Sequence, residues 1–191
     1  MTTDFISIVS GYPRSGTSLM MQMLAAGGMP VLVDEFKKPD EHNPRGYFEY
    51  APALNLGGKD TTTDWVADAQ GKAVKVIAYQ LQHLPTTFEY RVIFMKRKIA
   101  EVLASWCKMG LTRPDVKLNE REQILAFKTE YAIYEARLMR QKNARVLFVQ
   151  YNDLLANPRE QIARVRDFVG VPLDADAMLG AIDPALHRNR L

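Results

Sequence analysis

The sequence has almost no cysteine, little net charge and no long apolar run. Cys107 is the single cysteine among 191 residues, so an intramolecular disulfide is excluded. The formal net charge of +3 is too small to indicate binding to nucleic acid or to an anionic membrane, and any functional basic patch must be local. No apolar stretch is long enough to cross a bilayer. These absences favour a cytoplasmic protein with neither nucleic acid nor membrane as a partner.

Internal repeats, low-complexity segments and linkers are also missing. The first apolar run begins almost at the amino terminus of the given sequence, which predicts no signal peptide. Hydrophobic residues make up 47% of the chain and charged residues 25%, which is ordinary for a globular protein. We therefore expect one domain over residues 1–191, large enough to bury a substantial core.

A glycine-bounded loop is the most informative feature that the sequence does contain. Residues 11–18, Gly-Tyr-Pro-Arg-Ser-Gly-Thr-Ser, follow the apolar run 5–9 and precede a helical pattern. Backbone N–H groups and the positive end of a helix dipole bind phosphate in such a loop. Thr17 stands where the nucleoside triphosphate loop requires lysine, and the cation is upstream at Arg14. The loop therefore indicates a phosphate-like ligand other than ATP or GTP, an ordinary glycine turn being the alternative.

Apolar strand patterns alternate with amphipathic helix patterns along the rest of the chain. This alternation predicts a three-layer α/β fold, in which helices flank a central, mostly parallel sheet and ligands bind at the carboxyl ends of the strands. Residues 33–50 are expected to form a long ordered loop. The expected strands lie at 5–9, 72–78, 90–95 and 145–149, and the expected helices at about 99–109, 120–143 and 157–169.

The segment from Pro13 to Ser18 resembles the 5′-phosphosulfate loop of the sulfotransferases. These enzymes transfer a sulfuryl group from 3′-phosphoadenosine 5′-phosphosulfate (PAPS) to a hydroxyl or amine and release 3′-phosphoadenosine 5′-phosphate (PAP). The resemblance implies that Arg14 stabilises the charge that builds on the oxygen bridging to the leaving nucleotide. It implies no divalent metal. The residues that it assigns to the donor are Pro13, Arg14, Ser15, Gly16, Thr17 and Ser18.

A second motif strengthens this resemblance. Sulfotransferases bind the 3′-phosphate with an arginine at a strand end and a serine eight residues later in the next helix, and Arg97 and Ser105 have this spacing. A guanidinium and a hydroxyl suit phosphate oxygens. That the two side chains converge is implied by the resemblance and not by helical periodicity. Lys98-Ile99 departs from the usual Asn-Pro or Asp-Pro, and the alternative is a surface arginine with a helix-packing serine.

Further stretches resemble small bacterial sulfotransferases. Residues 43–49, Asn-Pro-Arg-Gly-Tyr-Phe-Glu, match a segment that these proteins often carry after the first helix. Residues 151–155 match a segment beyond the fourth strand, which implies that Tyr151 lies near the adenine. A late Arg-Lys-Gly segment, which closes over the nucleotide in many members, is absent. Basic residues at 187–190 either substitute for it or form a frayed tail.

The base that removes the acceptor's proton is an acidic residue in this reading. Tyrosylprotein and trehalose-type sulfotransferases use a glutamate nineteen residues after the second glycine of the loop, and counting from Gly16 gives Glu35. Glu49 is the second choice and His42 the third. The alternative for Glu35 is a solvated loop carboxylate.

Animal cytosolic sulfotransferases instead use a histidine in a Lys-Thr-His stretch. The similar place here begins at Lys75 and holds no histidine, so Lys75 is expected only to assist at the sulfuryl group. His83 is expected to be structural. The sequence thus predicts a PAPS-dependent sulfotransferase with a small-molecule or carbohydrate acceptor. A small nucleotide-dependent kinase and a non-catalytic nucleotide-binding protein are the alternatives.

Overall fold

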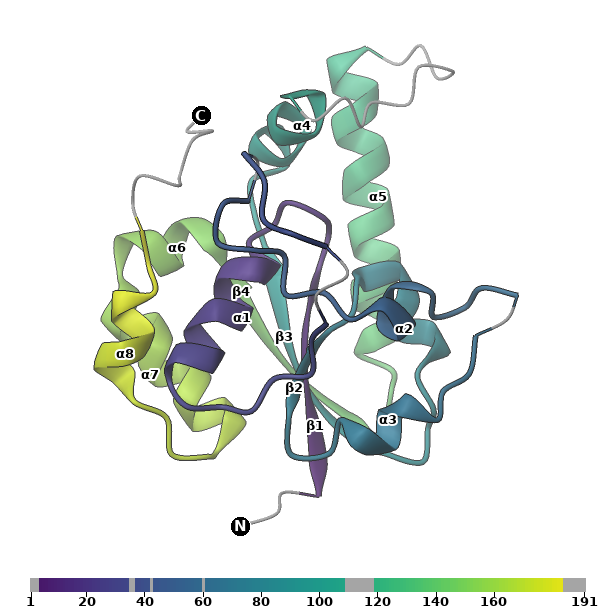
Figure 1. The fold of residues 1–191 in the computed structure, drawn as a ribbon. Coiled ribbons are helices and arrows are strands. Elements are labelled where there is room, and N and C mark those ends of the chain that lie inside the picture. Colours follow the sequence, from purple (N-terminus) through teal and green to yellow (C-terminus); the bar gives the residue numbers. More distant parts are fainter. Residues whose placement is uncertain (1–3, 35–36, 42, 60, 109–118, 184–191) are drawn as a thin grey trace.

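A parallel sheet forms the centre of the molecule. The computed structural model describes residues 4–34, 37–41, 43–59, 61–108 and 119–183. Within these ranges the strands run in the order β2-β1-β3-β4, and each neighbouring pair is parallel. This confirms the α/β fold that the sequence predicts (Figure 1). The strands are β1 (Phe5–Gly11), β2 (Ala73–Lys75), β3 (Glu89–Lys96) and β4 (Ala144–Gln150).

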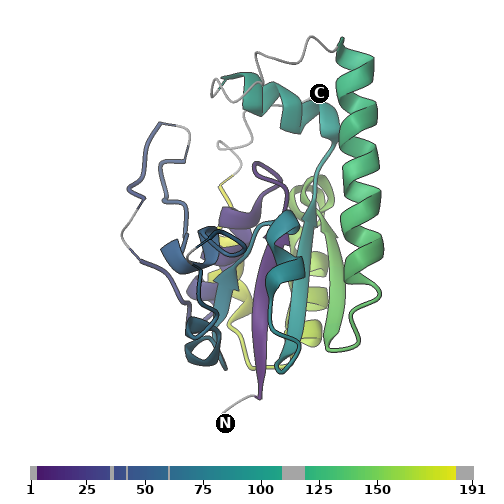
Figure 2. The same ribbon diagram turned by 90° about the vertical axis from the view of Figure 1, so that its right-hand side faces the viewer.

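Helices cover both faces of this sheet (Figures 1 and 2). One face carries α1 (Thr17–Ala26), α6 (Tyr151–Ala156), α7 (Pro158–Val169) and α8 (Ala175–Gly180). The other face carries α2 (Ala51–Leu54), α3 (Trp65–Asp68), the 3₁₀ helix η1 (Ala78–His83) and α5 (Glu120–Leu138). Helix α4 (Ile99–Lys108) lies beyond the carboxyl ends of the strands and next to the upper part of α5 (Figure 2).

Successive residues of the central strands enter two different cores. In β3, Val92 and Phe94 pack on the side of α5, whereas Ile93 and Met95 pack on the side of α1 and α7. All four side chains are buried. Strands that are covered on both faces are apolar at nearly every position, which is why the sequence shows them as continuous runs.

Several element ends differ from the sequence-based expectation, among them that of β2, which stops at Lys75 and not near residue 78. Helix α5 ends at Leu138 and not near residue 143, because the chain turns there and the Asn143 side chain donates to the carbonyl of Phe88 at 2.8 Å. Asn157 precedes α7 but makes no side-chain cap. A capping box forms at the start of α5, where Asn119 and Glu122 bond to each other's backbone N–H groups.

The carboxyl ends of β1, β2 and β3 meet at one edge of the sheet. The glycine loop follows β1, Lys75 ends β2, and Arg97 follows β3. The long loop between α1 and α2 lies beside the same edge (Figure 2). Residues that are far apart in the sequence are therefore gathered where ligands bind in open α/β sheets.

Candidate active site

The loop after β1 has a backbone that requires glycine at both ends. Gly11 has a φ of 144° and Gly16 a φ of 100°. A Cβ atom at Gly16 would lie 2.4 Å from the ring of Tyr151, so a larger residue does not fit. The Ser15 hydroxyl donates to the Tyr12 carbonyl at 2.7 Å and holds the turn from inside. Helix α1 begins at Thr17, and the N–H groups of its first turn have no partner within the helix.

Arg14 connects the loop to α4. Its Nε donates to Ser105 Oγ at 2.9 Å, and its carbonyl accepts from Arg97 Nη1 at 3.2 Å. Arg14 has a φ of 73°, which is uncommon for a residue with a side chain. The guanidinium of Arg97 lies over the Tyr151 ring, with Cζ 4.5 Å from the ring centroid. The structure therefore brings together Arg14, Arg97, Ser105 and Tyr151.

A buried carboxylate holds Arg97 in place. Glu101 is 1% exposed, and its Oε2 accepts from Arg97 Nε at 2.7 Å. Its Oε1 accepts from Asn152 Nδ2 at 2.9 Å. The sequence analysis missed Glu101. The available signal was its position four residues after Arg97 in a predicted helix, where opposite charges face each other.

A cavity of about 350 Å³ lies beside the glycine loop. Seven of the predicted donor-binding residues line it, namely Arg14, Gly16, Thr17, Ser18, Arg97, Ser105 and Tyr151. Two others shape the loop instead: Ser15 is fully buried, and the Pro13 carbonyl accepts from Trp106 Nε1 at 3.1 Å. Residues that the sequence analysis did not assign also line the cavity, namely Leu19, Gln22, Glu41, Asn43, Pro44, Lys108 and Asp183.

The cavity suits a ligand with more than one anionic group. Burial lowers the pKa of Arg14, and the nearby charge of Arg97 lowers it further. Two guanidinium groups held this close repel each other, and an anion placed between or beside them relieves the repulsion. The N–H groups at the start of α1 form one set of possible donors to an anion, and the side chains of Arg97 and Ser105 form a second set. A nucleotide with phosphates at both ends of its ribose fits this set of donors.

Lys75 and Glu49 form a buried pair beside the glycine loop. Lys75 Nζ lies 3.2 Å from Glu49 Oε1 and 3.4 Å from Ser18 Oγ, and it also donates to the Tyr47 carbonyl. The side chains of Lys75 and Glu49 are 4% and 10% exposed. Burial lowers the pKa of Lys75 from 10.5 to about 8, whereas Glu49 acts in the opposite direction. The lysine is therefore a cation whose charge changes in the physiological range.

The long loop brings more polar side chains to this pair. Lys37 Nζ lies 3.7 Å from Glu49 Oε2 and 3.8 Å from the centroid of the Tyr47 ring. The Tyr47 hydroxyl donates to Asp40 Oδ2 at 2.6 Å. Two other candidates, Glu35 and His42, lie outside the described residues.

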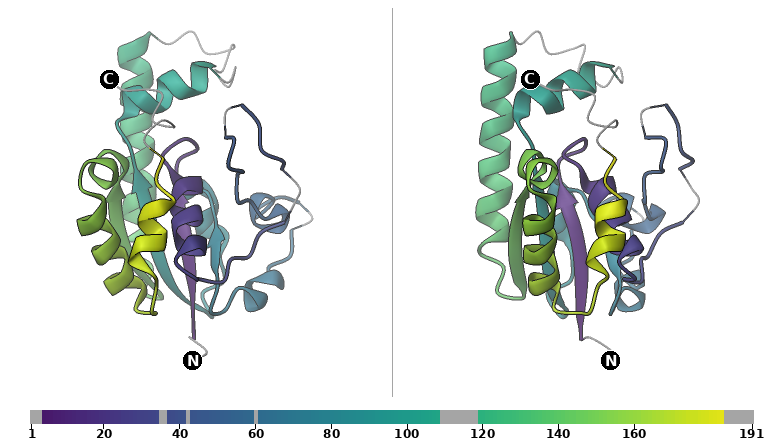
Figure 3. Two further views of the ribbon diagram at one scale, coloured as in Figure 1. Left: turned by 60° about the vertical axis from the view of Figure 1, so that its left-hand side comes forward. Right: turned by 90° about the vertical axis from the view of Figure 1, so that its left-hand side faces the viewer.

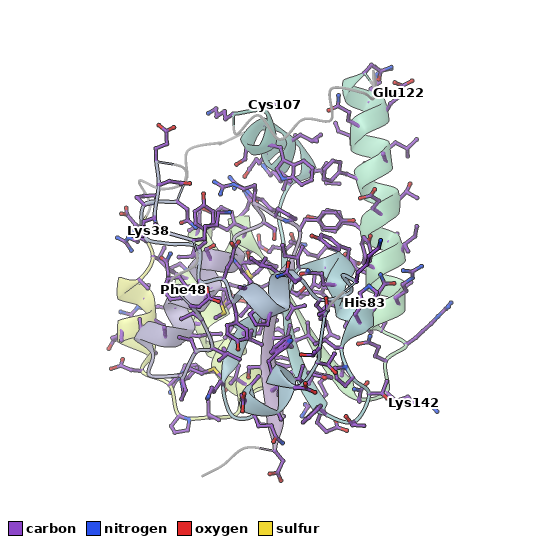
Figure 4. All side chains as sticks on the ribbon, turned by 45° about the vertical axis from the view of Figure 1, so that its right-hand side comes forward. Lys38, Phe48, His83, Cys107, Glu122 and Lys142 are labelled. Carbon is purple, nitrogen blue, oxygen red and sulfur yellow. The ribbon has the colours of Figure 1, made fainter. Side chains whose placement is uncertain are left out.

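His83 stands apart from this site. It ends η1 and packs so closely against Gly57 that a Cβ atom there would lie 2.6 Å from the imidazole ring. Figure 4 places its side chain on the α5 side of the molecule, well separated from Phe48 of the long loop. This position agrees with the structural role expected for His83. Among the described residues, no group of three or more His, Cys, Asp or Glu side chains is arranged to hold a metal ion, and no helix there is long and apolar enough to span a membrane.

Comparisons with known proteins identify the family. The family model of the sulfotransferase domain matches residues 6–184, so the chain belongs to the sulfotransferase family. This confirms the resemblance found in the sequence. None of the curated protein sequences matches the chain at a significant level.

Solved sulfotransferases share the fold at low sequence identity. The sulfotransferase domain of the Synechococcus PCC 7002 olefin synthase is 17% identical, with a TM-score of 0.56 over 98% of this chain and 80% of that one. Sulfotransferase STF1 of Mycobacterium tuberculosis H37Rv is 18% identical, with a TM-score of 0.56 over 94% of this chain and 70% of that one. Mouse sulfotransferase SULT7A1, solved in complex with PAP, is 16% identical, with a TM-score of 0.56 over 93% and 62%.

Proposed function

We propose that this protein transfers a sulfuryl group from PAPS to a hydroxyl or amine of a small-molecule or carbohydrate acceptor. One observation carries the proposal: a single cavity joins the glycine loop to Arg97 and Ser105 and so offers two separate anion positions. Membership of the sulfotransferase family supports it, as does the PAP bound in the mouse relative.

The glycine loop would bind the 5′ side of the donor. When PAPS is bound, its sulfuryl group passes to the acceptor oxygen, the S–O bond to the nucleotide breaks, and the acceptor's proton leaves to a base. Arg14 is the cation that stabilises the charge developing on the bridging oxygen, together with the first-turn N–H groups of α1. Thr17 and Ser18 line the same cavity, and the Thr17 hydroxyl supplies a further donor. Pro13 and Ser15 hold the loop in this shape.

The 3′-phosphate would lie at Arg97 and Ser105. Glu101 orients the Arg97 guanidinium, which is 8% exposed, so this donor is already in place before a ligand arrives. Arg14 Nε occupies the Ser105 hydroxyl in the structure, and we expect that bond to be exchanged for phosphate contacts. Tyr151 lines the cavity beside these residues, which supports its proposed place near the adenine.

Glu35 is proposed as the general base and Lys75 as a cation at the sulfuryl group. Lys75 reaches Ser18 Oγ, so it stands on the side of the loop that faces the transferred group. Glu49 holds Lys75 and is the alternative base.

Ligand-induced stabilisation tests the proposal. We expect PAP to raise the melting temperature of the protein much more than ATP with magnesium does, because a ligand that binds only the native state stabilises it. Equal or larger stabilisation by ATP with magnesium would instead support the kinase alternative. Binding of PAP without transfer from radiolabelled PAPS, in a screen of alcohol, phenol, sugar and amine acceptors, would indicate a non-catalytic protein.

A further inference from the structure

We propose that Arg45 is a positioning residue for the donor nucleotide. Within the proposed function, on which this inference rests, Arg45 ties segment 43–47 of the long loop to Asp183 near the end of the chain. This tie places both parts against the donor cavity. The structure therefore assigns to an internal salt bridge the closing role that a late Arg-Lys-Gly segment has in many relatives.

Arg45 makes two contacts with the same short stretch. Its Nη1 donates to the Ala181 carbonyl at 2.8 Å, and its Nη2 lies 3.0 Å from Asp183 Oδ2. That stretch directly follows α8, which packs on α1 (Figure 3). The backbone of Asp174, the N-cap of α8, donates to the Gly27 carbonyl at 3.0 Å. Arg45 is thus attached to a part of the fold that is fixed relative to the glycine loop.

The other side of segment 43–47 holds the loop itself. Asn43 Nδ2 donates to Ser18 Oγ at 3.1 Å, and Ser18 Oγ donates to the Tyr47 carbonyl at 3.1 Å. Arg45 lies between these two attachment points in the sequence. Asn43, Pro44 and Asp183 all line the donor cavity. Loss of the Arg45 contacts therefore removes a direct tie between the two parts of this wall.

Arg45 also balances the negative charge at this wall of the cavity. Asp183 is a carboxylate on a cavity that must accept an anionic nucleotide, and Arg45 compensates its charge. The two side chains are 41% and 32% exposed. Ion pairs this exposed add little to the stability of a fold. Removing Arg45 should consequently weaken nucleotide binding without unfolding the protein.

The first experiment compares two arginine variants. In Arg45→Ala, we expect the dissociation constant for PAP to rise about five- to tenfold and PAP to dissociate faster, while the melting temperature without ligand stays close to that of the unchanged protein. The matched control is Arg159→Ala. Arg159 also pairs with an aspartate, Asp176 of α8, at 3.2 Å, but it does not line the donor cavity. Unchanged PAP affinity in Arg45→Ala, or an equal loss in Arg159→Ala, overturns the proposal.

The second experiment separates positioning from charge compensation. The double variant Arg45→Ala with Asp183→Asn no longer has an uncompensated carboxylate at the cavity. If Arg45 positions the wall, this variant stays weakened for PAP. Recovery of the original affinity would overturn the proposal, since neutralising Asp183 would then be the whole effect. If the unchanged protein itself fails to bind PAP, the proposed function fails, and that outcome is distinct from either result with the variants.

Discussion

Lys75 is a residue whose acid–base chemistry is strongly altered by its surroundings. Its amine is nearly buried, and the loss of hydration disfavours the charged form. Glu49 compensates in part, so the pKa of Lys75 is lowered to about 8 and not further. Lysine at this position is therefore a cation whose presence depends on pH and on one neighbouring carboxylate. An arginine would stay charged at all relevant pH values.

The pH dependence of sulfuryl transfer should follow Lys75. Below pH 8 the amine is protonated and supplies a cation beside Ser18, and above it the cation is lost, so kcat/KM should fall as the pH rises through about 8. Glu49→Gln removes the charge that raises the pKa of Lys75 and should move this fall to lower pH. Lys37→Met removes a charge that lowers it and should move the fall to higher pH. A pH profile of kcat/KM that is the same in both variants would contradict this role.

Glu35 and Glu49 can be told apart by what each does to nucleotide binding. Glu35→Gln keeps size and polarity but cannot accept a proton, so turnover should fall by roughly two to four orders of magnitude while PAP affinity barely changes. Glu49→Gln should lower PAP affinity as well, because it leaves Lys75 without its partner next to Ser18. Single-turnover rates and calorimetric titration with PAP measure the two effects. Full turnover in Glu35→Gln with collapse in Glu49→Gln would move the assignment of the base to Glu49.

At the scale of the element, one arginine joins a strand, a helix end and an aromatic ring. Arg91 of β3 donates to the carbonyls of Phe168 and Val169 at the carboxyl end of α7. Its guanidinium lies 3.7 Å from the centroid of the Phe5 ring on β1. Gly170 ends the helix in the left-handed conformation, and a Cβ there would lie 2.6 Å from the Arg91 guanidinium. A positive charge is favourable at this end of a helix dipole.

Arg91→Met should therefore lower the free energy of unfolding by about 1–2 kcal/mol, through lost helix capping and lost cation–π contact. Arg145→Met is the control, because Arg145 is the register partner of Arg91 on β4 and its positive charge repels that of Arg91. We expect the control to be neutral or slightly stabilising. Urea unfolding of both variants measures the difference, and an equal loss in both would show that the capping contact contributes nothing specific.

Local signals explain which elements could be predicted from the sequence. The glycine loop is encoded within eight residues, and the strands are apolar because both faces of the sheet are covered. The end of α5 was predicted too late, because residues 139–142 contain neither glycine nor proline to mark a stop. The short helices α2 and α3 were missed for a related reason, since four residues are too few to show a period of 3.6.

At the scale of the whole molecule, the candidate site was predictable only where a motif fixes it. Arg14, Arg97 and Ser105 could be assigned because their spacing within two motifs resembles the sulfotransferases. Contacts such as Arg45 with Asp183 join residues 138 apart in the sequence and depend on the packing of α8 on α1. No local sequence pattern in either segment predicts this contact. The acceptor could not be named for the same reason, since its surroundings come from loops without a repeating pattern.

The cavity that we propose for the donor is lined by segments that lie far apart in the sequence. The shift in melting temperature that each nucleotide causes should therefore reveal the role of Arg97. Arg97→Ala lowers the unliganded melting temperature, because Glu101 is left buried without its cation. Measured from each variant's own unliganded value, the shift caused by PAP should shrink by roughly 3–6 °C for each tenfold loss of affinity. The shift caused by adenosine 5′-phosphosulfate, which has no 3′-phosphate, should be unchanged. Glu101→Gln removes the charge that orients Arg97, so it should show the same discrimination between the two nucleotides to a smaller extent. If Arg97→Ala reduces both shifts equally, Arg97 supports the fold and does not bind the 3′-phosphate.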